Sequence, residues 1–245
     1  MGRFLATDID GTLMSPYRNN NDEYVKTSDT RWGKSFMRKS NLDMLVELQD
    51  LIPVIPVTTR SRKSYLSLIE VSFPVAAIEN GAILMVNGNV DTDWERISEK
   101  MYSSVMRQQR DNILNKMSMR GYLIKNETKY VIDLIKPSGS CDEDYDYMTE
   151  IAYLYDVYRG GTKGLYAIPK CFDKSVAVRR LCNMLKKKAI TAGDSEADWK
   201  MLLFNESYGL SNGPAVHKFD IGKYQKDNHT FCEYFLNEIQ NIVAK

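Results

Sequence analysis

The sequence predicts an α/β protein whose parallel-sheet core is interrupted by an inserted α+β lobe. In residues 1–84 and 169–245, short apolar runs that end in polar residues alternate with segments of helical periodicity, a pattern typical of a parallel sheet with flanking helices. Between them the order changes to α-β-β-α-β-β, and strands that follow each other directly indicate antiparallel pairing. We therefore divide the chain into a first core part (1–84), a lobe (85–168) and a second core part (169–245).

Composition and charge narrow the class of protein. A formal net charge of +1 gives the whole chain no attraction to nucleic acid or to a membrane surface. The N-terminal segment meets an aspartate before it could form the apolar core of a signal peptide, and no run approaches the ~20 apolar residues that span a bilayer. The four cysteines form no C-x-x-C pair, which favours free thiols in a reducing cytosol. We expect a cytoplasmic protein without a membrane or nucleic-acid partner.

The first core part begins with a short buried strand at residues 3–6. A helix follows at 40–51, with Ser40 as its N-cap. The apolar run at 52–57 predicts a second strand, although Pro56 lacks the N–H group that a central strand donates. After it we expect a helix at 65–72 and then two strands joined by a turn at Asn80-Gly81.

Residues 14–40 are polar and irregular. The segment is long for a connection in a compact domain, where the median is roughly 4–6 residues. We interpret it as a solvated surface insertion. Its basic residues and its aromatic residues Tyr24, Trp32 and Phe36 leave open a flap that faces the substrate.

The lobe and the second core part complete the pattern. In the lobe we expect one long helix at 93–119, two strands at 122–137, a helix at 145–156 and a hairpin around Gly160-Gly161. In the second core part we expect a helix from Lys174, a strand that ends in an acidic turn, a new helix after that turn, a short strand-turn at 207–213 and a closing helix at 229–245. Phe231, Phe235, Ile239 and Ile242 share one face of that closing helix, which indicates that it packs on the core.

Asp8 and Asp10 carry the first chemical signal. An EF-hand loop that begins at Asp8 needs Asp or Asn at position 12, glycine at position 13 and glutamate at position 19. The chain has Thr12, Leu13 and Asn19 there, so a calcium loop is excluded. In an extended chain, residues i and i+2 point to the same side, and two carboxylates in one pocket repel unless a divalent cation such as Mg²⁺ lies between them. One could instead act as a nucleophile toward phosphorus and the other as a general acid and base. Gly11 permits a tight turn in which backbone N–H groups point toward a bound phosphate.

Three further elements extend this signal. Thr58 and Thr59 end the second apolar strand, Lys174 opens a helix, and Asp194 and Asp198 follow a third apolar strand. Each has an ordinary structural explanation: a strand end, a solvated helix face or a helix cap. These separate explanations do not account for the order of the four elements along the chain. The carboxyl ends of parallel strands lie at one edge of the sheet, where ligands bind, so all four elements would meet there.

The four elements resemble the motifs of the haloacid dehalogenase superfamily of phosphatases. The matching residues, in order, are DIDGTL (8–13), TTR (58–60), Lys174 and GDSEAD (193–198). The lobe between the second and third motifs is similar to the small C2B-type cap of sucrose-phosphate, mannosyl-phosphoglycerate and trehalose-phosphate phosphatases and of phosphomannomutase. IENGAI (78–83) and YAIPKCFDKS (166–175) look like the segments that border this cap.

The resemblance implies a role for each matching residue. Asp8 is the nucleophile, Asp10 the general acid and base, Thr58 a ligand of the transferring phosphoryl group, and Lys174 the cation that steadies nucleophile and phosphate. Asp194 holds Mg²⁺ together with Asp8 and the backbone carbonyl of Asp10, and Asp198 orients the metal shell. The residues expected to contact substrate are Gly11, Thr58, Thr59, Arg60, Asn80 and Lys174. The chain departs from the family's motifs at three positions: Thr59 and Ser175 replace the usual glycines, and Ala197 replaces the usual asparagine.

The sequence therefore predicts a Mg²⁺-dependent phosphatase of a small phosphorylated metabolite, with a sugar phosphate as the favoured substrate. Two alternatives stay open. A phosphomutase would need a second phosphate site, for which Arg120, Arg159 and Lys163 are candidates. A protein that binds a metabolite without turnover could use the same fold.

Overall fold

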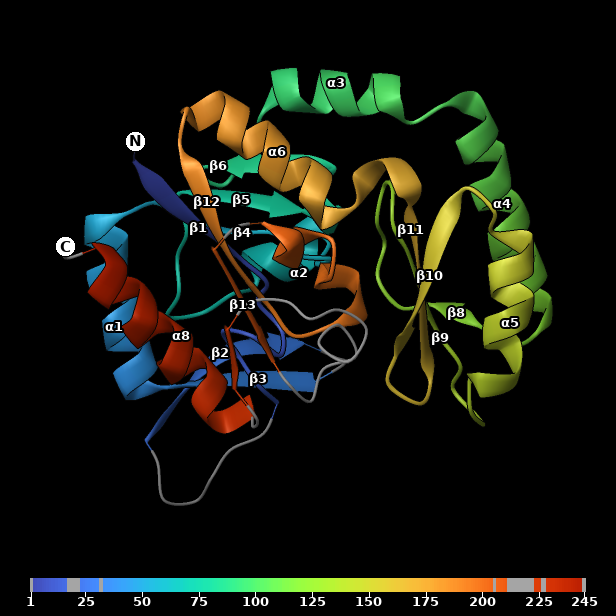
Figure 1. Ribbon diagram of the computed structural model, residues 1–245. Coiled ribbons are helices and arrows are strands. Elements are labelled where there is room, and N and C mark those ends of the chain that lie inside the picture. The colour runs from blue at the N-terminus through green and yellow to red at the C-terminus, as the bar shows by residue number, and fades with distance from the viewer. Residues whose placement is uncertain are drawn as a thin grey trace.

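The core is a five-stranded parallel sheet, as predicted (Figure 1). The computed structural model describes residues 2–16, 23–30, 33–204, 206–210, 223–225 and 228–243. The strand order is β14-β13-β12-β1-β4 and all pairs are parallel. The strands are β1 (Arg3–Thr7), β4 (Val54–Pro56), β12 (Lys188–Gly193), β13 (Glu206–Leu210) and β14 (Lys223–Gln225).

Helices cover both faces of this sheet. Helices α1 (Lys39–Leu51) and α8 (Asn228–Val243) lie on one side, and α6 (Lys174–Leu185) lies on the other. Successive side chains of a strand point to opposite faces: in β1, Leu5 packs in the cluster that contains α1 and α8, whereas Phe4 and Ala6 pack in the cluster that contains α6. The closing helix buries Phe231, Phe235 and Ile239 completely. Its predicted core face is confirmed.

A small antiparallel sheet extends the core beyond β4. It consists of β5 (Val75–Ile78), β6 (Ile83–Val86) and β7 (Asn89–Val90), with the 3-10 turn η1 (Glu79–Gly81) between its first two strands. The predicted strand, turn and strand are confirmed. Pro56 is the last residue of β4, at the edge of the parallel sheet, and Val57 then bridges to Ala77. The missing N–H of Pro56 therefore interrupts no strand interior.

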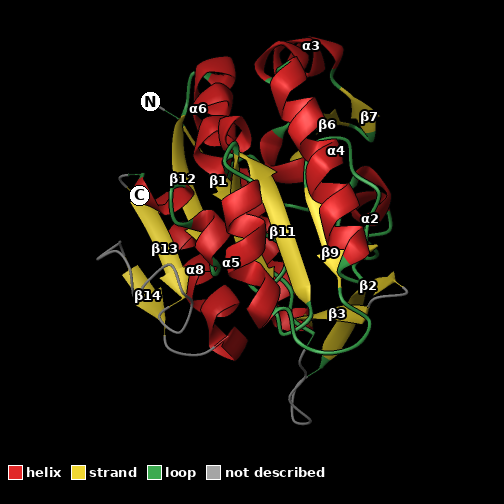
Figure 2. Cartoon of the chain, turned by 90° about the vertical axis from the view of Figure 1, so that its right-hand side faces the viewer, coloured by secondary structure: helices red, strands yellow, loops and turns green. Residues whose placement is uncertain are grey.

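The lobe has an antiparallel sheet of order β10-β11-β9-β8, with helices α4 and α5 on its outer face (Figures 1 and 2). Its elements are α3 (Thr92–Met101), α4 (Ser104–Met119), β8 (Leu123–Ile124), β9 (Ile132–Ile135), α5 (Asp142–Ile151), β10 (Tyr155–Gly160) and β11 (Gly164–Pro169). In β9, Ile132 and Leu134 pack in the hydrophobic core of the lobe. Because side chains alternate along a strand, Asp133 belongs to the opposite face, which is turned toward the core sheet.

The segment at 14–40 is not the irregular insertion that we expected. It contains a hairpin of β2 (Tyr24–Thr30) and β3 (Gly33–Arg38), and Trp32 lies outside the described residues. The backbone groups of Ser15 and Phe36 exchange two hydrogen bonds of 2.9 and 2.8 Å, and Thr27 and Ser28 are buried. These contacts come from residues far apart in the sequence, so the local polar composition could not indicate them.

Several predicted helices also need correction. The helix at 93–119 is two helices, because buried Tyr102 leaves the helical path and Ser103 accepts a hydrogen bond from the Met106 N–H to begin α4. The helix at 65–72 is the shorter α2 (Arg62–Leu66), and the helix at 145–156 ends at Ile151, since Tyr155 already pairs in β10. After the acidic turn the chain forms the 3-10 turns η3 (Glu196–Asp198) and η4 (Met201–Leu203) in place of an α-helix. Helix α1 begins at Lys39 without a side-chain cap, so Ser40 is not its N-cap.

The four cysteines are free thiols, as expected. Within the described ranges, no helix combines the length and apolar character needed to cross a membrane.

Gly81 tests how η1 packs against α6. Its φ is +91°, and a Cβ atom there would lie 2.2 Å from the Cβ of Ala177. Gly88 has a similar φ of +79° but open space around it, so it is a matched control for the backbone cost alone. We expect Gly88→Ala to lower the free energy of unfolding by about 1–2 kcal/mol and Gly81→Ala to lower it by about 1–3 kcal/mol more, measured by urea denaturation. Equal losses in the two variants would contradict the close packing.

Candidate active site

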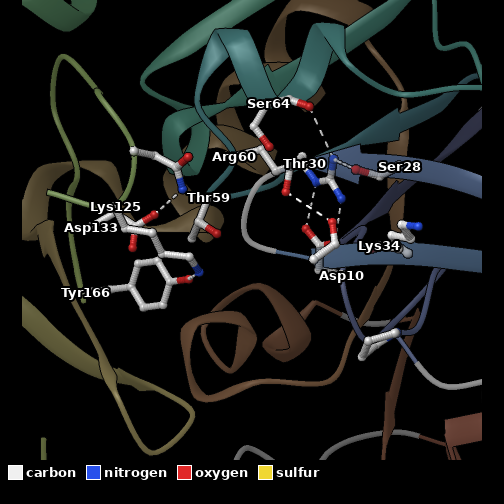
Figure 3. Close-up of a pocket in the computed structure, with 14 residues that line it drawn as sticks. Asp10, Ser28, Thr30, Lys34, Thr59, Arg60, Ser64, Lys125, Asp133 and Tyr166 are labelled. Carbon is white, nitrogen blue, oxygen red and sulfur yellow. Dashed lines mark hydrogen bonds and ion pairs between the residues drawn. The ribbon is translucent and has the colours of Figure 1, made fainter. Parts of the chain in front are cut away.

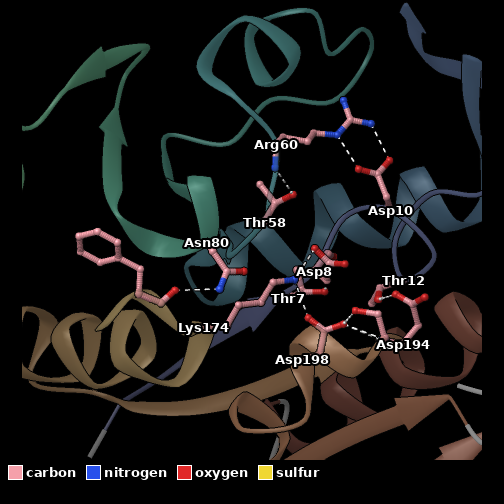
Figure 4. A network of polar contacts seen from close by, with 12 residues as sticks. Thr7, Asp8, Asp10, Thr12, Thr58, Arg60, Asn80, Lys174, Asp194 and Asp198 are labelled. Carbon is pink, nitrogen blue, oxygen red and sulfur yellow. Dashed lines mark hydrogen bonds and ion pairs between the residues drawn. The ribbon is translucent and has the colours of Figure 1, made fainter. Parts of the chain in front are cut away.

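Asp8 follows β1 and lies in a buried ion pair with Lys174 (Figure 4). Its N–H donates to the carbonyl of Ala192 in β12 (2.9 Å), which holds it at the carboxyl edge of the sheet. Lys174, the first residue of α6, is only 1% exposed. Its Nζ lies 2.8 Å from Oδ1 of Asp8 and 2.5 Å from Oδ1 of Asp198. The structure thus brings Asp8 together with Lys174 and Asp198, which follow it by more than 160 positions in the sequence.

Asp198 organises the loop after β12. Its Oδ2 accepts hydrogen bonds from the N–H of Asp194 (3.2 Å), the N–H of Ser195 (2.8 Å) and the Ser195 hydroxyl (2.6 Å). Among the residues that the structure describes, every donor to this carboxylate comes from its own loop or from Lys174. Asp198 is completely buried, and these contacts compensate for the cost of burying its charge.

Gly11 and Thr12 join the first loop to Asp194. The Thr12 hydroxyl donates to Oδ1 of Asp194 (2.8 Å). Gly11 has a φ of +90°, and a Cβ atom there would lie 2.2 Å from Oδ2 of Asp194. Glycine is therefore required both by the backbone conformation and by the close approach of this carboxylate.

Asp8, Asp194 and Asp198 form a carboxylate cluster in which one oxygen of each lies within 4.8 Å of the others. Burial raises the pKa of Asp8 to about 7, with Asp198 adding to the shift and Lys174 opposing it. Burial, followed by the charges of Asp198 and Asp8, raises the pKa of Asp194. Three carboxylates face one ammonium group, and hard oxygen donors with excess negative charge fit a divalent cation.

Lys174 keeps its charge in this cluster. Burial alone would lower the pKa of Lys174, but the charges and hydrogen bonds of Asp198 and Asp8 outweigh burial and raise it. The side chain is therefore an ammonium group at neutral pH, and it favours the ionised form of Asp8.

Asp10 points to a different partner from Asp8. Its carboxylate accepts two hydrogen bonds from Arg60, from Nε (2.7 Å) and from a terminal nitrogen (2.6 Å), in a bidentate pair. The side chain of Asp10 is 48% exposed, whereas that of Arg60 is 8% exposed. β1 ends at Thr7, so the chain is not extended through Asp10 and the alternation that we assumed does not apply. The carboxylate of Asp10 lies outside the cluster, and the role of its backbone carbonyl as a metal ligand stays a prediction.

Thr58 and Asn80 are buried beside this network. Thr58 accepts a hydrogen bond from the Arg60 N–H (3.3 Å), and its carbonyl accepts one from the Asn80 N–H (2.7 Å). The Asn80 amide donates to the Phe172 carbonyl (2.7 Å), which ties η1 to the segment before α6. Contacts of Thr58 and Asn80 with substrate stay predictions.

A polar pocket of about 300 Å³ lies above Asp10 and Arg60, between the core, the hairpin and the lobe (Figure 3). Thr59 lines it, and its backbone is not in the left-handed region, so the usual glycine is not needed there for conformation. The residues that sequence reasoning missed are those from the hairpin and the lobe: Ser28, Thr30, Lys34, Ser35, Lys125, Asn126, Asp133 and Tyr166. Two signals were present in the sequence: Asp133 is a charged residue inside the apolar run YVIDLI, and the flap left open for the basic residues of 14–40 includes Lys34.

The candidates for a second phosphate site lie elsewhere. Arg120 pairs with Asp144 (2.7 Å), Arg159 lies 3.6 Å from Asp142, and Lys163 donates to a backbone carbonyl. None of the three lines the pocket.

No protein-family model matches the sequence, and no curated protein matches it either. Similar solved structures cover the chain almost completely. The protein 0175 of Thermoplasma acidophilum is 18% identical, with a TM-score of 0.69 and coverage of 100% of this chain and 99% of that one. A haloacid dehalogenase-like hydrolase from B. subtilis is 13% identical, with a TM-score of 0.71 and coverage of 98% and 100%.

A third similar structure is the sucrose-phosphatase from Synechocystis sp. PCC6803, solved with sucrose and phosphate. It is 14% identical, with a TM-score of 0.62 and coverage of 98% of this chain and 97% of that one. At these identities the similarity establishes the fold. The resemblance indicated by the four motifs is thus confirmed at that level: this chain has the haloacid dehalogenase-like fold.

Proposed function

We propose that this protein is a phosphatase that hydrolyses a small phosphorylated metabolite through an aspartyl-phosphate on Asp8. The observation that carries the proposal is the buried Asp8–Lys174 pair within the cluster of three carboxylates. Phosphoryl transfer depends mainly on positioning and charge stabilisation, and this arrangement supplies both. The sucrose-phosphatase among the similar structures favours a sugar phosphate as substrate.

In the first step the Asp8 carboxylate attacks phosphorus, and the bond from phosphorus to the leaving oxygen breaks. Lys174 orients the carboxylate and offsets the negative charge of the phosphoryl oxygens. Asp10, in its protonated form, gives a proton to the leaving oxygen. Its half-exposed carboxyl group lines the pocket, so it can reach a leaving group there once it is released from Arg60.

In the second step water attacks the aspartyl-phosphate. Asp10 takes a proton from that water, inorganic phosphate leaves, and Asp8 and Asp10 return to their starting forms. The Thr58 hydroxyl and the backbone around Gly11 are the proposed donors to the phosphoryl oxygens. Arg60 has a positioning role before the reaction, because its bidentate pair holds the Asp10 carboxylate at the pocket until the leaving oxygen takes its place.

We propose Mg²⁺ as the cofactor. Asp8 and Asp194 would hold it, with the Asp10 carbonyl as a further ligand, while Asp198 keeps the loop of Asp194 in place. A bound Mg²⁺ would reduce the negative charge that the phosphate meets at the cluster. The donor set fits, since each side chain offers a carboxylate oxygen and the cluster has more negative than positive charge.

We assign the lobe as a C2B-type cap over the site, with residues 1–84 and 169–245 as the core and 85–168 as the cap. Support comes from the pocket, which has walls from both parts. An inserted lid can exclude water and contact the leaving group. No observation favours a phosphomutase, because the three candidate phosphate ligands lie away from the pocket.

Asp8→Asn tests the nucleophile. The amide has nearly the same shape but cannot form the acyl-phosphate, so we expect the rate of phosphate release from a sugar-phosphate panel to fall by at least about 10³-fold. Asp43→Asn is the matched control, since it makes the same change on an exposed carboxylate of α1. Phosphate release by Asp8→Asn at the wild-type rate would contradict the proposal.

The raised pKa of Asp8 predicts that stabilisation by Mg²⁺ depends on pH. Between its unfolded value of 3.8 and about 7, folded metal-free protein keeps a proton on Asp8 that the unfolded chain has lost. Metal-free stability contributed by this group is therefore greatest at low pH and falls as pH rises through that range. A proton on Asp8 competes with a cation, so the increase in Tm on adding MgCl₂ should be larger at pH 8 than at pH 5.5.

Asp194→Asn serves as the control for this measurement and should remove most of the Mg²⁺-dependent increase in Tm. An increase that is equal at the two pH values, or that persists in Asp194→Asn, would contradict a metal site at the cluster.

A further inference from the structure

A second hollow lies along α6, apart from the pocket above Asp10. It has a volume of about 870 Å³ and shares no lining residue with that pocket. Its lining comes from α6, from the start of β12 and from the segment 200–204. Phe204 stands just before β13, whose first residue pairs beside Ile190 of β12, so this end of the hollow lies at the amino edge of the sheet. We call the hollow the α6 groove.

One face of α6 lines the groove. Arg179, Asn183 and Lys186 follow one another at intervals of four and three residues, which places them on the same side of a helix. The apolar residues Val178 and Leu181 of α6 are completely buried in the core. The helix therefore packs on the sheet with an apolar face and presents a polar face to the groove.

The groove is strongly cationic. Five of its lining side chains carry a positive charge: Arg179, Lys186, Lys187, Lys188 and Lys200. Among the lining residues that the structure describes, the single carboxylate is that of Asp173, which lies 3.5 Å from Lys200. The other four cations have no carboxylate within ion-pair distance in the described part of the chain. In a chain with a net charge of +1, this is a large local excess of positive charge.

The helix dipole explains only part of this charge. Cations at the carboxyl end of a helix are stabilised by its dipole, and Lys186 is the C-cap of α6. Arg179 lies near the middle of that helix, and Lys188 belongs to β12, so the dipole does not account for them. Like charges gathered in one hollow repel each other, and an anionic ligand would remove that repulsion.

The groove also has an apolar wall. The half-buried Phe204 packs against the core cluster that contains Leu181 and Ala189, and Leu203 beside it is 56% exposed. An aromatic ring is a surface on which a planar base can stack. The volume falls within the roughly 300–1,000 Å³ of small-molecule sites. Cations gathered in one hollow favour a small ligand over a strand of nucleic acid, whose phosphates spread their contacts along an extended surface.

We propose that the α6 groove binds a nucleoside triphosphate. Its phosphates would lie against Arg179 and the lysines at 186–188, because guanidinium and ammonium groups are strong donors to phosphate oxygens, and its base would lie against Phe204. A single phosphate group carries at most about −2 charge, whereas a triphosphate balances the four unpaired cations more completely. The proposal does not depend on the phosphatase function, since the two sites share no lining residue.

Calorimetric titration in EDTA tests the site with ATP, inorganic tripolyphosphate and adenosine as probes. We expect one ATP per chain, with a Kd at least about fivefold lower than that of tripolyphosphate, because the base adds a stacking contact. Adenosine, which lacks the phosphates, should bind at least about tenfold more weakly than ATP. Three results would overturn the proposal: no binding of ATP, tripolyphosphate that binds as tightly as ATP, or adenosine that does so.

The variant Lys187→Gln/Lys188→Gln tests the cationic wall. Loss of two charge-assisted contacts should raise the Kd of ATP by at least about tenfold. Lys100→Gln/Lys116→Gln is the matched control, because it removes the same charge from one exposed and one half-buried lysine on α3 and α4, away from the groove. It should leave the Kd within about twofold of the wild-type value. Equal changes in the two variants would reduce the binding to a general charge effect and overturn the proposal.

Phe204→Leu tests the apolar wall. Loss of the ring should raise the Kd of ATP by about 5–50-fold and leave the Kd of tripolyphosphate unchanged. Phe204→Tyr keeps the ring and should bind ATP as the wild type does. Equal losses for the two ligands in Phe204→Leu, or no loss for ATP, would overturn the proposal. If the leucine variant does not fold, the comparison of ATP with tripolyphosphate on the wild type decides.

Two further measurements separate the groove from other sites. Asp8→Asn changes the active site alone, so its Kd for ATP should equal that of the wild type. A Kd that changes in Asp8→Asn but not in Lys187→Gln/Lys188→Gln would place the nucleotide at the active site and overturn the proposal. A thymidine oligonucleotide that binds more tightly than ATP, and loses affinity in the lysine variant, would assign the groove to single-stranded nucleic acid and overturn it as well.

Discussion

The buried ion pair between Lys174 and Asp8 is the interaction on which the site depends. An ammonium group that is 1% exposed can stay charged only if carboxylates surround it, and here Asp8 and Asp198 do so at 2.8 and 2.5 Å. These residues come from the end of β1, the start of α6 and the loop after β12. The packing of α6 on the sheet therefore also brings Lys174 to the two carboxylates of the site.

Two levels of polar structure follow from this pair. The lower level is the cluster of Asp8, Asp194 and Asp198 around Lys174. The upper level is the pocket above Asp10 and Arg60, walled by the hairpin and the lobe. Asp10 belongs to the upper level because Arg60 holds its carboxylate there. This separation matches the proposed division of work: Asp8 meets the phosphoryl group and Asp10 meets the leaving oxygen.

Asp198 and Asp133 show why not every buried carboxylate has the same meaning. Within the described ranges Asp198 receives four hydrogen bonds, from Lys174, from the N–H groups of Asp194 and Ser195 and from the Ser195 hydroxyl, which compensate for the burial of its charge. Asp133 receives one from Asn126, and its second oxygen is buried without a hydrogen-bond partner in the described residues. The first therefore supports the geometry of the loop, whereas the charge of the second is only partly compensated by hydrogen bonds.

The parallel core, the strand–turn–strand at η1 and the residues of the Lys174 site could be predicted from the sequence. Strand ends and helix starts are marked by local periodicity, and parallel strands collect their carboxyl ends at one edge. The hairpin at 24–38 and the break at Ser103 could not, since their local polar composition has no clear strand or helix-end pattern, and the Asp10–Arg60 pair could not, since it joins residues 50 positions apart. The same holds for Asp133: its charge is visible in the apolar run of β9, but only the placement of the lobe beside the core turns that charge toward the pocket.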